Sequence, residues 1–386
     1  MSLQYRWITT TSALESYVDA LLGEERYALD TEFHRERTYF PKLALLQFAG
    51  AGELVLVDPL SCDLSCLVRL FESDALAVLH AAQQDLDVLT HAVRAIPSRL
   101  FDTQLAAGFC GYSTPSLVSL LQGELRVTAA KGDRLTDWLR RPLTDDQCQY
   151  AAADVAHLFD LHDRLTERLT RDGRLDWVVE ACEELRTKPV SGTDPEMAWT
   201  RIKDVRVLRP RARGVARSVA AWRERRAMDI DSPVRQVLPD LAILGIAQKQ
   251  PRTAAELAHA RGVDDRHTRG SIAQQILAAV EAGMSDEVEL PSPEGEELDR
   301  NLRPAVTLVS AWVSEVARRE RVDTALLATR NDLVAFLRGD ADARLAHGWR
   351  QTMIGDGIQR LVSGGAALTF DGRGGLDLVD LPGSAT

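Results

Sequence analysis

Two acidic residues separated by one position, Asp30 and Glu32, close the first apolar run of the 386-residue chain. If this run is a β-strand, the two carboxylates lie on one face, about 7 Å apart along the backbone. Paired oxygen ligands of this kind suit Mg²⁺ or Mn²⁺. The pattern alone is weak, because Asp194 and Glu196 repeat it in a proline-containing stretch where nothing else indicates a site.

Tyr150 and Asp154 could add a phenol and a third carboxylate from a segment with helical spacing. Residues four apart lie one turn apart on the same helix face, and the alanines at 151–153 let that face approach another element closely. Asp85 follows an apolar segment at 75–80 and could supply a fourth carboxylate. Taken singly, a buried tyrosine with a satisfied hydroxyl, a solvated aspartate and a helix-capping aspartate are better explanations of these residues than a catalytic site.

Together the four carboxylates and the phenol describe a known type of chemistry. In two-metal phosphodiester hydrolysis, carboxylates hold two divalent ions about 4 Å apart; one ion generates hydroxide and the other stabilises the leaving oxygen. A tyrosine beside the attacking water can orient it. Such a site needs neither a histidine base nor a covalent nucleophile.

The elements that must position these residues alternate as in a mixed α/β domain. Short apolar runs predict strands, other stretches have helical spacing, and turn residues separate them. We expect strands at 27–33, 43–48, 54–57 and 75–80, helices at 64–71 and 85–93, and one or two long helices over 145–185.

Two linkers divide the chain. Residues 188–195 carry two prolines and a glycine, and residues 285–297 combine acidic residues with prolines and a glycine. Between the linkers the pattern is helical. After the second linker, helical patterns lead to two short strands near 367–370 and 376–379, which predicts a third domain with its own small sheet or hairpin.

Charge and composition narrow the class of protein. The 46 Lys and Arg against 57 Asp and Glu give a net charge of −11, so a polyanion site must be local. The stretch 201–226 supplies such a patch, with ten basic residues against Asp204 and Glu224. The alternative is that several of these arginines pair with acids of the first domain.

Cysteine and histidine usage argues against zinc and disulfides. Five cysteines without a C-x-x-C pair predict free, buried thiols, and eight scattered histidines without H-E-x-x-H make a histidine zinc site improbable. No apolar run reaches about 18 residues and the first thirty residues lack a secretion signal, which predicts a cytoplasmic protein with no membrane contact.

Five linked segments resemble the ribonuclease D family in order and spacing. They are Asp-Thr-Glu-Phe at 30–33, Leu-His-Ala-Ala-Gln-Gln-Asp-Leu at 79–86, Phe-Asp-Thr-Gln-Leu-Ala-Ala at 101–107, Asp-Trp-Leu-Arg-Arg-Pro-Leu-Thr at 137–144 and Gln-Tyr-Ala-Ala-Ala-Asp-Val at 149–155. The resemblance implies an RNase H-like DEDD 3′→5′ exonuclease domain with a Tyr-x-x-x-Asp third motif. By motif, Asp30, Glu32, Asp85 and Asp154 would be the metal ligands, and Tyr150 would position the attacking water.

Other positions carry weaker implications. Asp102 lies in a family-like stretch, but satisfying backbone amides at a strand end is at least as good an explanation, so it is left out of the site. Lys131 lies where the family commonly keeps a lysine and could contact a phosphate or be a surface lysine. His34, and Gly132 with Asp133, depart from the family pattern. These departures could alter how the last nucleotides of the RNA are held.

Residues 216–227, 231–240 and 244–247 resemble the HRDC domain, whose helices usually bind nucleic acid. The C-terminal segment resembles a further HRDC-like domain, in which Arg350 and Arg360 could contact RNA or be plain surface charges. We therefore expect an α/β exonuclease domain at 1–190, an all-α HRDC domain at 208–286 and a mostly helical HRDC-like domain at 298–386. Candidate RNA contacts are Lys131, Arg211, Arg213, Arg217 and Arg223.

The resemblance implies a 3′→5′ exoribonuclease that uses two divalent ions, Mg²⁺ or Mn²⁺, and releases nucleoside 5′-monophosphates. Its expected partner is RNA, such as the 3′ ends of tRNA precursors or other structured RNA, and no obligatory protein partner is inferred. Two alternatives stay open: a DNA exonuclease of the same chemistry, and a nucleic-acid-binding protein that has lost catalysis.

Overall fold

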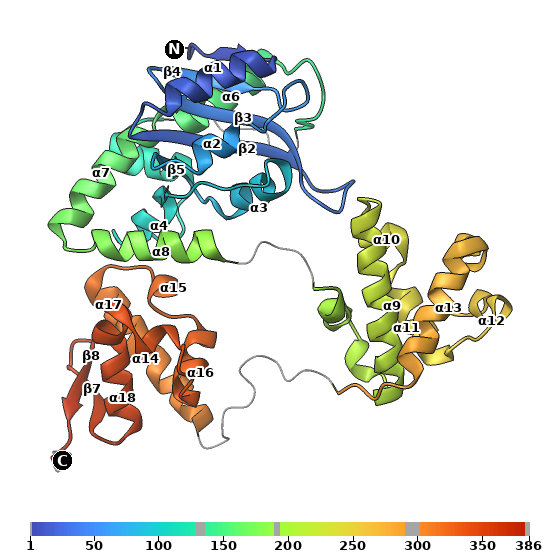
Figure 1. Ribbon diagram of the computed structural model, residues 1–386. Coiled ribbons are helices and arrows are strands. Elements are labelled where there is room, and N and C mark those ends of the chain that lie inside the picture. Colours follow the sequence, from blue (N-terminus) through green and yellow to red (C-terminus); the bar gives the residue numbers. More distant parts are fainter. Residues whose placement is uncertain (1, 129–135, 189–193, 290–301, 383–386) are drawn as a thin grey trace.

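The computed structural model describes residues 2–128, 136–188, 194–289 and 302–382. They form an N-terminal domain (2–188), a middle unit (194–289) and a C-terminal unit (302–382), which Figure 1 shows in blue to green, yellow, and orange to red. The C-terminal unit lies against the N-terminal domain, although the middle unit separates the two in sequence.

A six-stranded mixed sheet forms the centre of the N-terminal domain. Strands β2, β3 and β4 are antiparallel neighbours, whereas β1–β4, β2–β5 and β5–β6 are parallel pairs. The strand order is β1 (Arg6–Ile8), β4 (Glu53–Val57), β3 (Lys42–Gly50), β2 (Arg26–His34), β5 (Leu76–Leu79) and β6 (Leu100–Asp102). The strands predicted at 27–33, 43–48, 54–57 and 75–80 are all present.

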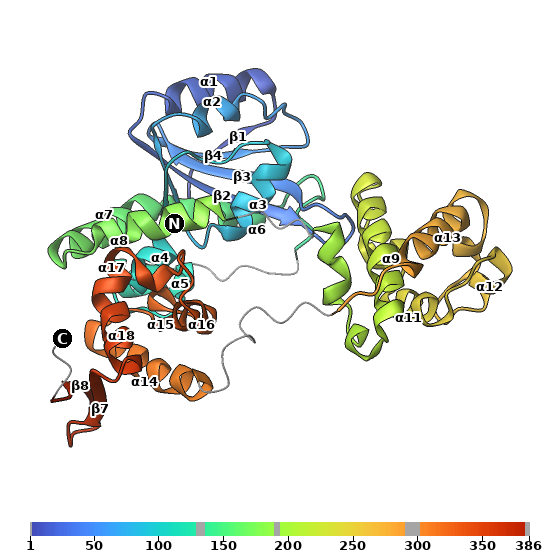
Figure 2. The same ribbon diagram turned by 60° about the horizontal axis from the view of Figure 1, so that its bottom comes forward.

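Helices cover both faces of this sheet. In Figure 2, α1 and α2 lie on one side of the strands and α6 and α7 on the other. The helices of the domain are α1 (Thr11–Leu21), α2 (Leu67–Phe71), α3 (Gln83–Ala92), α4 (Thr103–Gly108), α5 (Leu117–Leu120) with a π turn at Leu121–Leu125, α6 (Asp145–Ala156), α7 (Leu158–Arg171) and α8 (Leu175–Thr187). Apolar side chains from both layers bury the two faces, as in other α/β domains.

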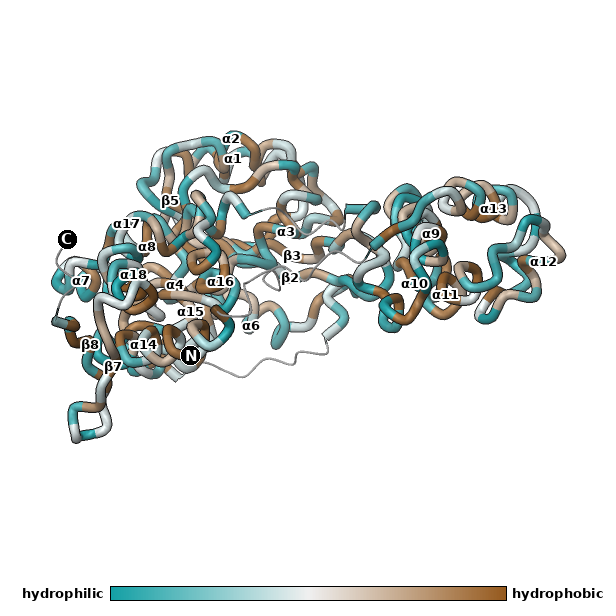
Figure 3. Tube along the Cα trace, turned by 90° about the horizontal axis from the view of Figure 1, so that it is seen from below, coloured by the Kyte–Doolittle hydropathy of each residue, from teal (hydrophilic) through white to brown (hydrophobic). Residues whose placement is uncertain are grey.

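The middle unit is all helical around a core of its own. Figure 3 shows hydrophobic and hydrophilic residues alternating along its longer helices, as expected for helices with one buried face. Its elements are 3₁₀ turns at Pro195–Arg201, Val205–Val207 and Asp265–Thr268, and helices α9 (Pro210–Asp229), α10 (Val234–Val237), α11 (Asp240–Lys249), α12 (Ala254–Ala258) and α13 (Gly270–Met284).

The C-terminal unit ends in the two-stranded hairpin that the sequence predicted. Its elements are α14 (Arg303–Glu320), α15 (Thr324–Leu327), α16 (Arg330–Arg338), a 3₁₀ turn at Arg344–Ala346, α17 (Gly348–Arg350), a π turn at Gln351–Gly355, α18 (Asp356–Val362), β7 (Ala366–Phe370) and β8 (Leu376–Asp380). Val309, Val313 and Ile358 of this unit belong to the same continuous hydrophobic core as the N-terminal sheet. The two parts therefore share a core instead of packing as separate domains.

Arg350 anchors this shared interface. Only 1% of its surface is exposed, and it donates to Glu180 and Glu184 of α8 at 3.0 Å each and to the carbonyl of Leu326 at 3.1 Å. Its guanidinium also lies over the Trp349 ring, 4.2 Å from the ring centre. Arg350 is thus neither an RNA contact nor a surface charge, and Arg360 pairs with Asp380 on the surface.

All five cysteines are free, as the sequence predicted; Cys66, Cys148 and Cys182 are also buried as expected, whereas Cys62 and Cys110 are partly exposed. Within the described segments, we find no helix with the length and apolar character needed to cross a membrane.

Candidate active site

Asp30 and Glu32 lie on β2, where the apolar residues Tyr27 to Leu29 place the strand in the middle of the sheet. In the pairing with β3, Asp30 is opposite Gln47 and Glu32 is opposite Leu45, so both acids share the face that α6 covers. The register shifts directly after Glu32, at a β-bulge. The extra residue is Ala44 on β3, because Glu32 pairs with Leu45 and Phe33 pairs with Leu43, so the irregularity lies in the strand next to the one that carries the two acids.

Helix α6 brings Tyr150 and Asp154 to the same face. Its N-terminus is fixed by a capping box in which the Thr144 hydroxyl accepts from the amide of Gln147 and the Gln147 side chain accepts from the Thr144 amide. Ala151 and Ala152 are fully buried against β3 and β4, and their small side chains allow the close approach that the sequence predicted. Oxygen atoms of Asp30, Glu32 and Asp154 all lie within 4.8 Å of one another.

Asp85, in the first turn of α3, approaches from the adjoining strand connection. The Thr31 hydroxyl donates to Asp85 Oδ1 at 2.5 Å, which fixes this carboxylate beside β2. Asp85 is not part of the three-carboxylate cluster, but its charge acts on both Asp30 and Glu32. The sequence analysis did not identify Thr31 as a site residue. Its position between Asp30 and Glu32 was the feature of the sequence that could have indicated this role.

Burial and mutual repulsion make the four carboxylates reluctant to ionise. Desolvation, followed by the charges of its neighbours, raises the pKa of Asp30 well above its ordinary value and that of Glu32 to about 8. Burial also raises the pKa of Asp85 and of Asp154 to about 7, against hydrogen bonds from Thr31 and Tyr150 respectively.

The donor set fits divalent cations. In the described part of the chain, no Lys, Arg or His forms an ion pair with any of the four acids. Concentrated carboxylate oxygens without a protein counter-charge are what Mg²⁺ and Mn²⁺ prefer as ligands. A divalent ion would reverse the repulsion that raises these pKa values.

The Tyr150 side chain lies beside the acids and also packs against an apolar neighbour. It donates a hydrogen bond to Asp154, and burial followed by the charges of Asp154, Glu32 and Asp30 raises the pKa of its hydroxyl. Its ring also contacts Trp138, with ring centres 6.1 Å apart. The hydroxyl therefore stays protonated at neutral pH and can hold a water molecule beside the acids.

Asp102 is a supporting residue, as its strand-end position suggested. Its carboxylate accepts from the amides of Ala81 and Ala82 at 3.0 and 2.8 Å and from the amide of Gln104 at 2.8 Å. Ala81 has a φ of 59°, an unfavourable angle for alanine that these bonds help to hold. Asp102 thus fixes the turn that leads into α3 and Asp85.

Gln47 is a second residue that the sequence reasoning missed. It is fully buried opposite Asp30, and neither atom of its amide group has a hydrogen-bond partner. A buried polar group without a partner costs about 1–3 kcal/mol. Its position within an apolar strand, next to the strand that carries the acids, was the only signal in the sequence.

The residues predicted to contact RNA lie in different surroundings from one another. Lys131 lies outside the described residues, as do Gly132 and Asp133. The other four arginines all lie in α9, and each has an acidic partner within the middle unit: Arg211 with Glu287, Arg213 with Glu289, Arg217 with Asp286 and Arg223 with Asp240.

The prediction that Arg223 contacts RNA is wrong, because only 4% of the surface of this residue is exposed. Its guanidinium donates to Asp240 at 2.6 Å and to the carbonyl of Leu238, inside the middle unit. An arginine held in this way has no surface to offer RNA.

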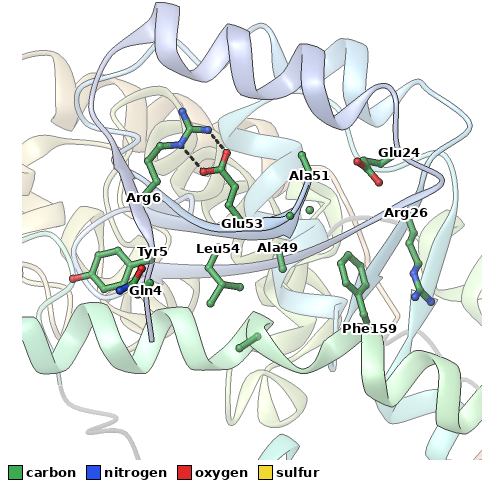
Figure 4. Close-up of a pocket in the computed structure, with 13 residues that line it drawn as sticks. Gln4, Tyr5, Arg6, Glu24, Arg26, Ala49, Ala51, Glu53, Leu54 and Phe159 are labelled. Atoms are coloured by element: carbon green, nitrogen blue, oxygen red, sulfur yellow. Dashed lines mark hydrogen bonds and ion pairs between the residues drawn. The ribbon is translucent and has the colours of Figure 1, made fainter. Parts of the chain in front are cut away.

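A large cavity lies elsewhere on the N-terminal domain. It measures about 710 Å³ and is bordered by the start of β2 and the turn after β3 (Figure 4), and none of the four acids lines it. Its cations are engaged: Arg6 pairs with Glu53, as the dashed lines in Figure 4 show, and Arg26 pairs with Asp163. The cavity therefore has no unpaired charge to recognise a phosphate, and the acidic cluster remains the candidate site.

The mixed sheet, the four acids and the tyrosine define a 3′→5′ exonuclease of the DEDD class. Residues 5–170 match the 3′-5′ exonuclease family, and residues 212–280 match the HRDC domain. Ribonuclease D of Gluconacetobacter diazotrophicus is 38% identical over 375 residues, which cover 95% of this chain and 94% of that protein. Ribonuclease D of Escherichia coli is 31% identical over 372 residues, covering 93% and 99%.

The solved structure of Escherichia coli RNase D, an exoribonuclease involved in structured RNA processing, covers 94% of this chain and 99% of its own with a TM-score of 0.81 at 29% identity. The chain belongs to the ribonuclease D family. It is a 3′→5′ exoribonuclease, and the predicted fold class, an exonuclease domain followed by an HRDC domain and a mostly helical C-terminal part, is confirmed. The DNA exonuclease and the silent binding protein are not favoured.

Proposed function

We propose that this exoribonuclease trims the 3′ ends of structured RNA, tRNA precursors among them, with two divalent ions held by Asp30, Glu32, Asp85 and Asp154. The observation that carries the proposal is the convergence of three carboxylates within 4.8 Å of one another, with Asp85 hydrogen-bonded to the same strand. The substrate class is supported by the Escherichia coli relative, described as an exoribonuclease involved in structured RNA processing.

The bound ions supply the positive charge that lowers the pKa of a coordinated water and stabilises the leaving oxygen. Mg²⁺ or Mn²⁺ suits the all-oxygen donor set. The role of the four acids is to fix the ions against β2, and the capping box at Thr144 fixes the start of the helix that carries Asp154.

Tyr150 orients the attacking water. Its hydroxyl is tied to Asp154, and its raised pKa keeps the proton on the phenol, so it acts through hydrogen bonding and not as a base. The water oxygen bonds to phosphorus, the bond between phosphorus and the 3′ oxygen of the penultimate nucleotide breaks, and that oxygen takes up a proton. The products are a nucleoside 5′-monophosphate and an RNA shortened by one nucleotide.

The test uses a 5′-labelled tRNA precursor with a 3′ extension and a matched single-stranded DNA. Each is incubated with Mg²⁺, with Mn²⁺ and with chelator, using wild type, Asp154→Asn and the control Asp146→Asn. Asp146 is exposed near the N-terminus of the same helix, so the control removes one negative charge from α6 without touching the cluster.

We expect a metal-dependent ladder that retreats from the RNA 3′ end with wild type and with Asp146→Asn, and no ladder with Asp154→Asn. Wild-type rates with Asp154→Asn would remove the proposed site. Preference for the DNA would overturn the substrate class, and cleavage in the presence of chelator would overturn the metal requirement.

A further inference from the structure

A basic stripe precedes helix α9 and is assigned by neither family match. It consists of Lys203, Arg206 and Arg209, and it lies between the exonuclease match, which ends at residue 170, and the HRDC match, which begins at residue 212. All three side chains are exposed.

The backbone under this stripe is anchored by buried residues at every third position. Ile202, Val205 and Leu208 are 3%, 1% and 3% exposed and belong to the core of the middle unit. The residues between them therefore point outward from a fixed ridge, and the exposed acid within it is Asp204. A fixed ridge loses less conformational entropy on binding than a floppy basic tail would.

The charge of this stripe is uncompensated, in contrast to that of α9. In the described segments, Lys203, Arg206 and Arg209 form no ion pair, whereas Arg211, Arg213 and Arg217 lie opposite Glu287, Glu289 and Asp286. In a chain of net charge −11, an unneutralised cluster of cations is where a polyanion would be attracted.

The middle unit, which carries the stripe, contacts the N-terminal domain near the end of α9 opposite the stripe. Figures 1 and 2 show the green segment that precedes α9 running beside that helix, with its first part toward the N-terminal domain and its last part leading into the start of α9. The middle unit contacts the loop between β2 and β3, because Asp231 Oδ1 accepts from the amides of Tyr39 and Phe40 at 3.0 Å and the Tyr39 hydroxyl donates to Glu224 at 2.7 Å. That loop connects to the strand that carries Asp30 and Glu32.

We propose that Lys203, Arg206 and Arg209 hold the phosphate backbone of the RNA upstream of the 3′ end being cleaved. This rests on the proposed function for the identity of the polymer, and it moves the RNA contact from the arginines of α9 to the segment before that helix. The contacts are to phosphates, so they add affinity that is independent of sequence and sensitive to salt.

The test compares wild type with the triple variant Lys203→Gln, Arg206→Gln, Arg209→Gln. The matched control is Lys249→Gln, Arg252→Gln, Arg261→Gln, which removes three exposed cations of the same unit from the region around α12, farther from the N-terminal domain in both views. Binding of a labelled single-stranded RNA of about 25 nucleotides is measured in chelator between 50 and 300 mM salt, where no cleavage occurs. Hydrolysis of a dinucleotide with Mg²⁺ is measured separately.

Each phosphate contact to a single strand contributes about 0.7 to the slope of log affinity against log salt. The stripe variant should therefore lose about 2 from that slope and about 50-fold in affinity near 150 mM salt. The control should stay within about 3-fold of wild type, and all three proteins should hydrolyse the dinucleotide equally, which shows that the exonuclease domain is folded. Equal thermal unfolding profiles show the same for the middle unit, which has its own core.

An unchanged salt slope in the stripe variant, or an equal loss in the control, would overturn the inference. Failure of the wild type to shorten the same RNA in Mg²⁺ would overturn the proposed function alone, because the binding arm does not depend on cleavage.

Discussion

Replacing Asp154 by asparagine should stabilise the metal-free protein while it destroys activity. The folded protein raises the pKa of Asp154 from an ordinary value of 3.8 to about 7, chiefly through burial. Each tenfold change in an ionisation constant is worth about 1.4 kcal/mol, so keeping this group ionised would cost the folded state about 4 kcal/mol if it titrated alone. Because Asp85 shares the repulsion, we expect a gain on the order of 2 kcal/mol for the variant above pH 7.

The stability difference between Asp154→Asn and wild type depends on pH in a direction that follows from the raised pKa. Above pH 7 the carboxylate is ionised in both states and the folded wild type carries the full cost. Between pH 7 and about 4 the folded state binds a proton that the unfolded chain has released, so the cost shrinks as the pH falls, and below the ordinary pKa it is gone. The advantage of Asp154→Asn should therefore be largest at pH 8 and absent near pH 4.

The assay is thermal unfolding in chelator at pH 8 and pH 5. A gain of about 2 kcal/mol raises the midpoint of a domain of this size by about 4 °C at pH 8. The surface control Asp146→Asn should shift the midpoint little or downward, because it removes a favourable acid from the first turn of α6. A midpoint for Asp154→Asn that matches wild type at pH 8, or that gains more at pH 5, would refute the reasoning. With Mg²⁺ the order should reverse, since the variant lacks a ligand.

Three further perturbations test separate parts of the structure. Tyr150→Phe should lower turnover of a short RNA by about 10²-fold while leaving its KM nearly unchanged, because only water orientation is lost; this is read from steady-state kinetics. Gln47→Leu should raise the stability of the metal-free protein by about 1–3 kcal/mol in thermal unfolding, since it removes a buried amide without partners; a loss of stability would show that the amide is satisfied. Arg350→Ala should cost about 3 kcal/mol and expose the C-terminal unit to limited proteolysis, whereas the surface control Arg360→Ala should cost less than about 1 kcal/mol.

Local sequence patterns predicted four of the six strands of the main sheet and the motifs that carry the candidate acids, whereas β1, β6 and α1 were not predicted. The strands at 26–34 and 42–50 are apolar runs with a central place in the sheet, and the four acids and Tyr150 carry linked motifs. Each strand and each motif depends on residues close together in sequence, where periodicity and spacing report the structure directly, whereas the expectation that the acids of separate motifs meet came from the family resemblance.

Features that depend on distant partners were missed. The sequence analysis treated Arg223 and Arg350 as exposed cations. Their acidic partners, Asp240 and Glu184, are 17 and 166 positions away in the sequence. The same is true of Thr31, whose partner Asp85 is 54 positions away. Pairing across such separations follows from tertiary packing, to which a single sequence gives no access.

The core shared by the N-terminal domain and the C-terminal unit has a consequence for folding during synthesis on the ribosome. The N-terminal domain is complete in sequence at residue 188, but Val309, Val313 and Ile358, which finish its core, emerge more than a hundred residues later. At roughly 5–20 residues per second, about 10 to 30 s pass between residues 188 and 358. During that interval the nascent chain presents an apolar face on α4 and α8, while the middle unit, with its own core, can already fold. The order of the three parts in the chain thus leaves the core of the catalytic domain unfinished until the C-terminal unit has been translated.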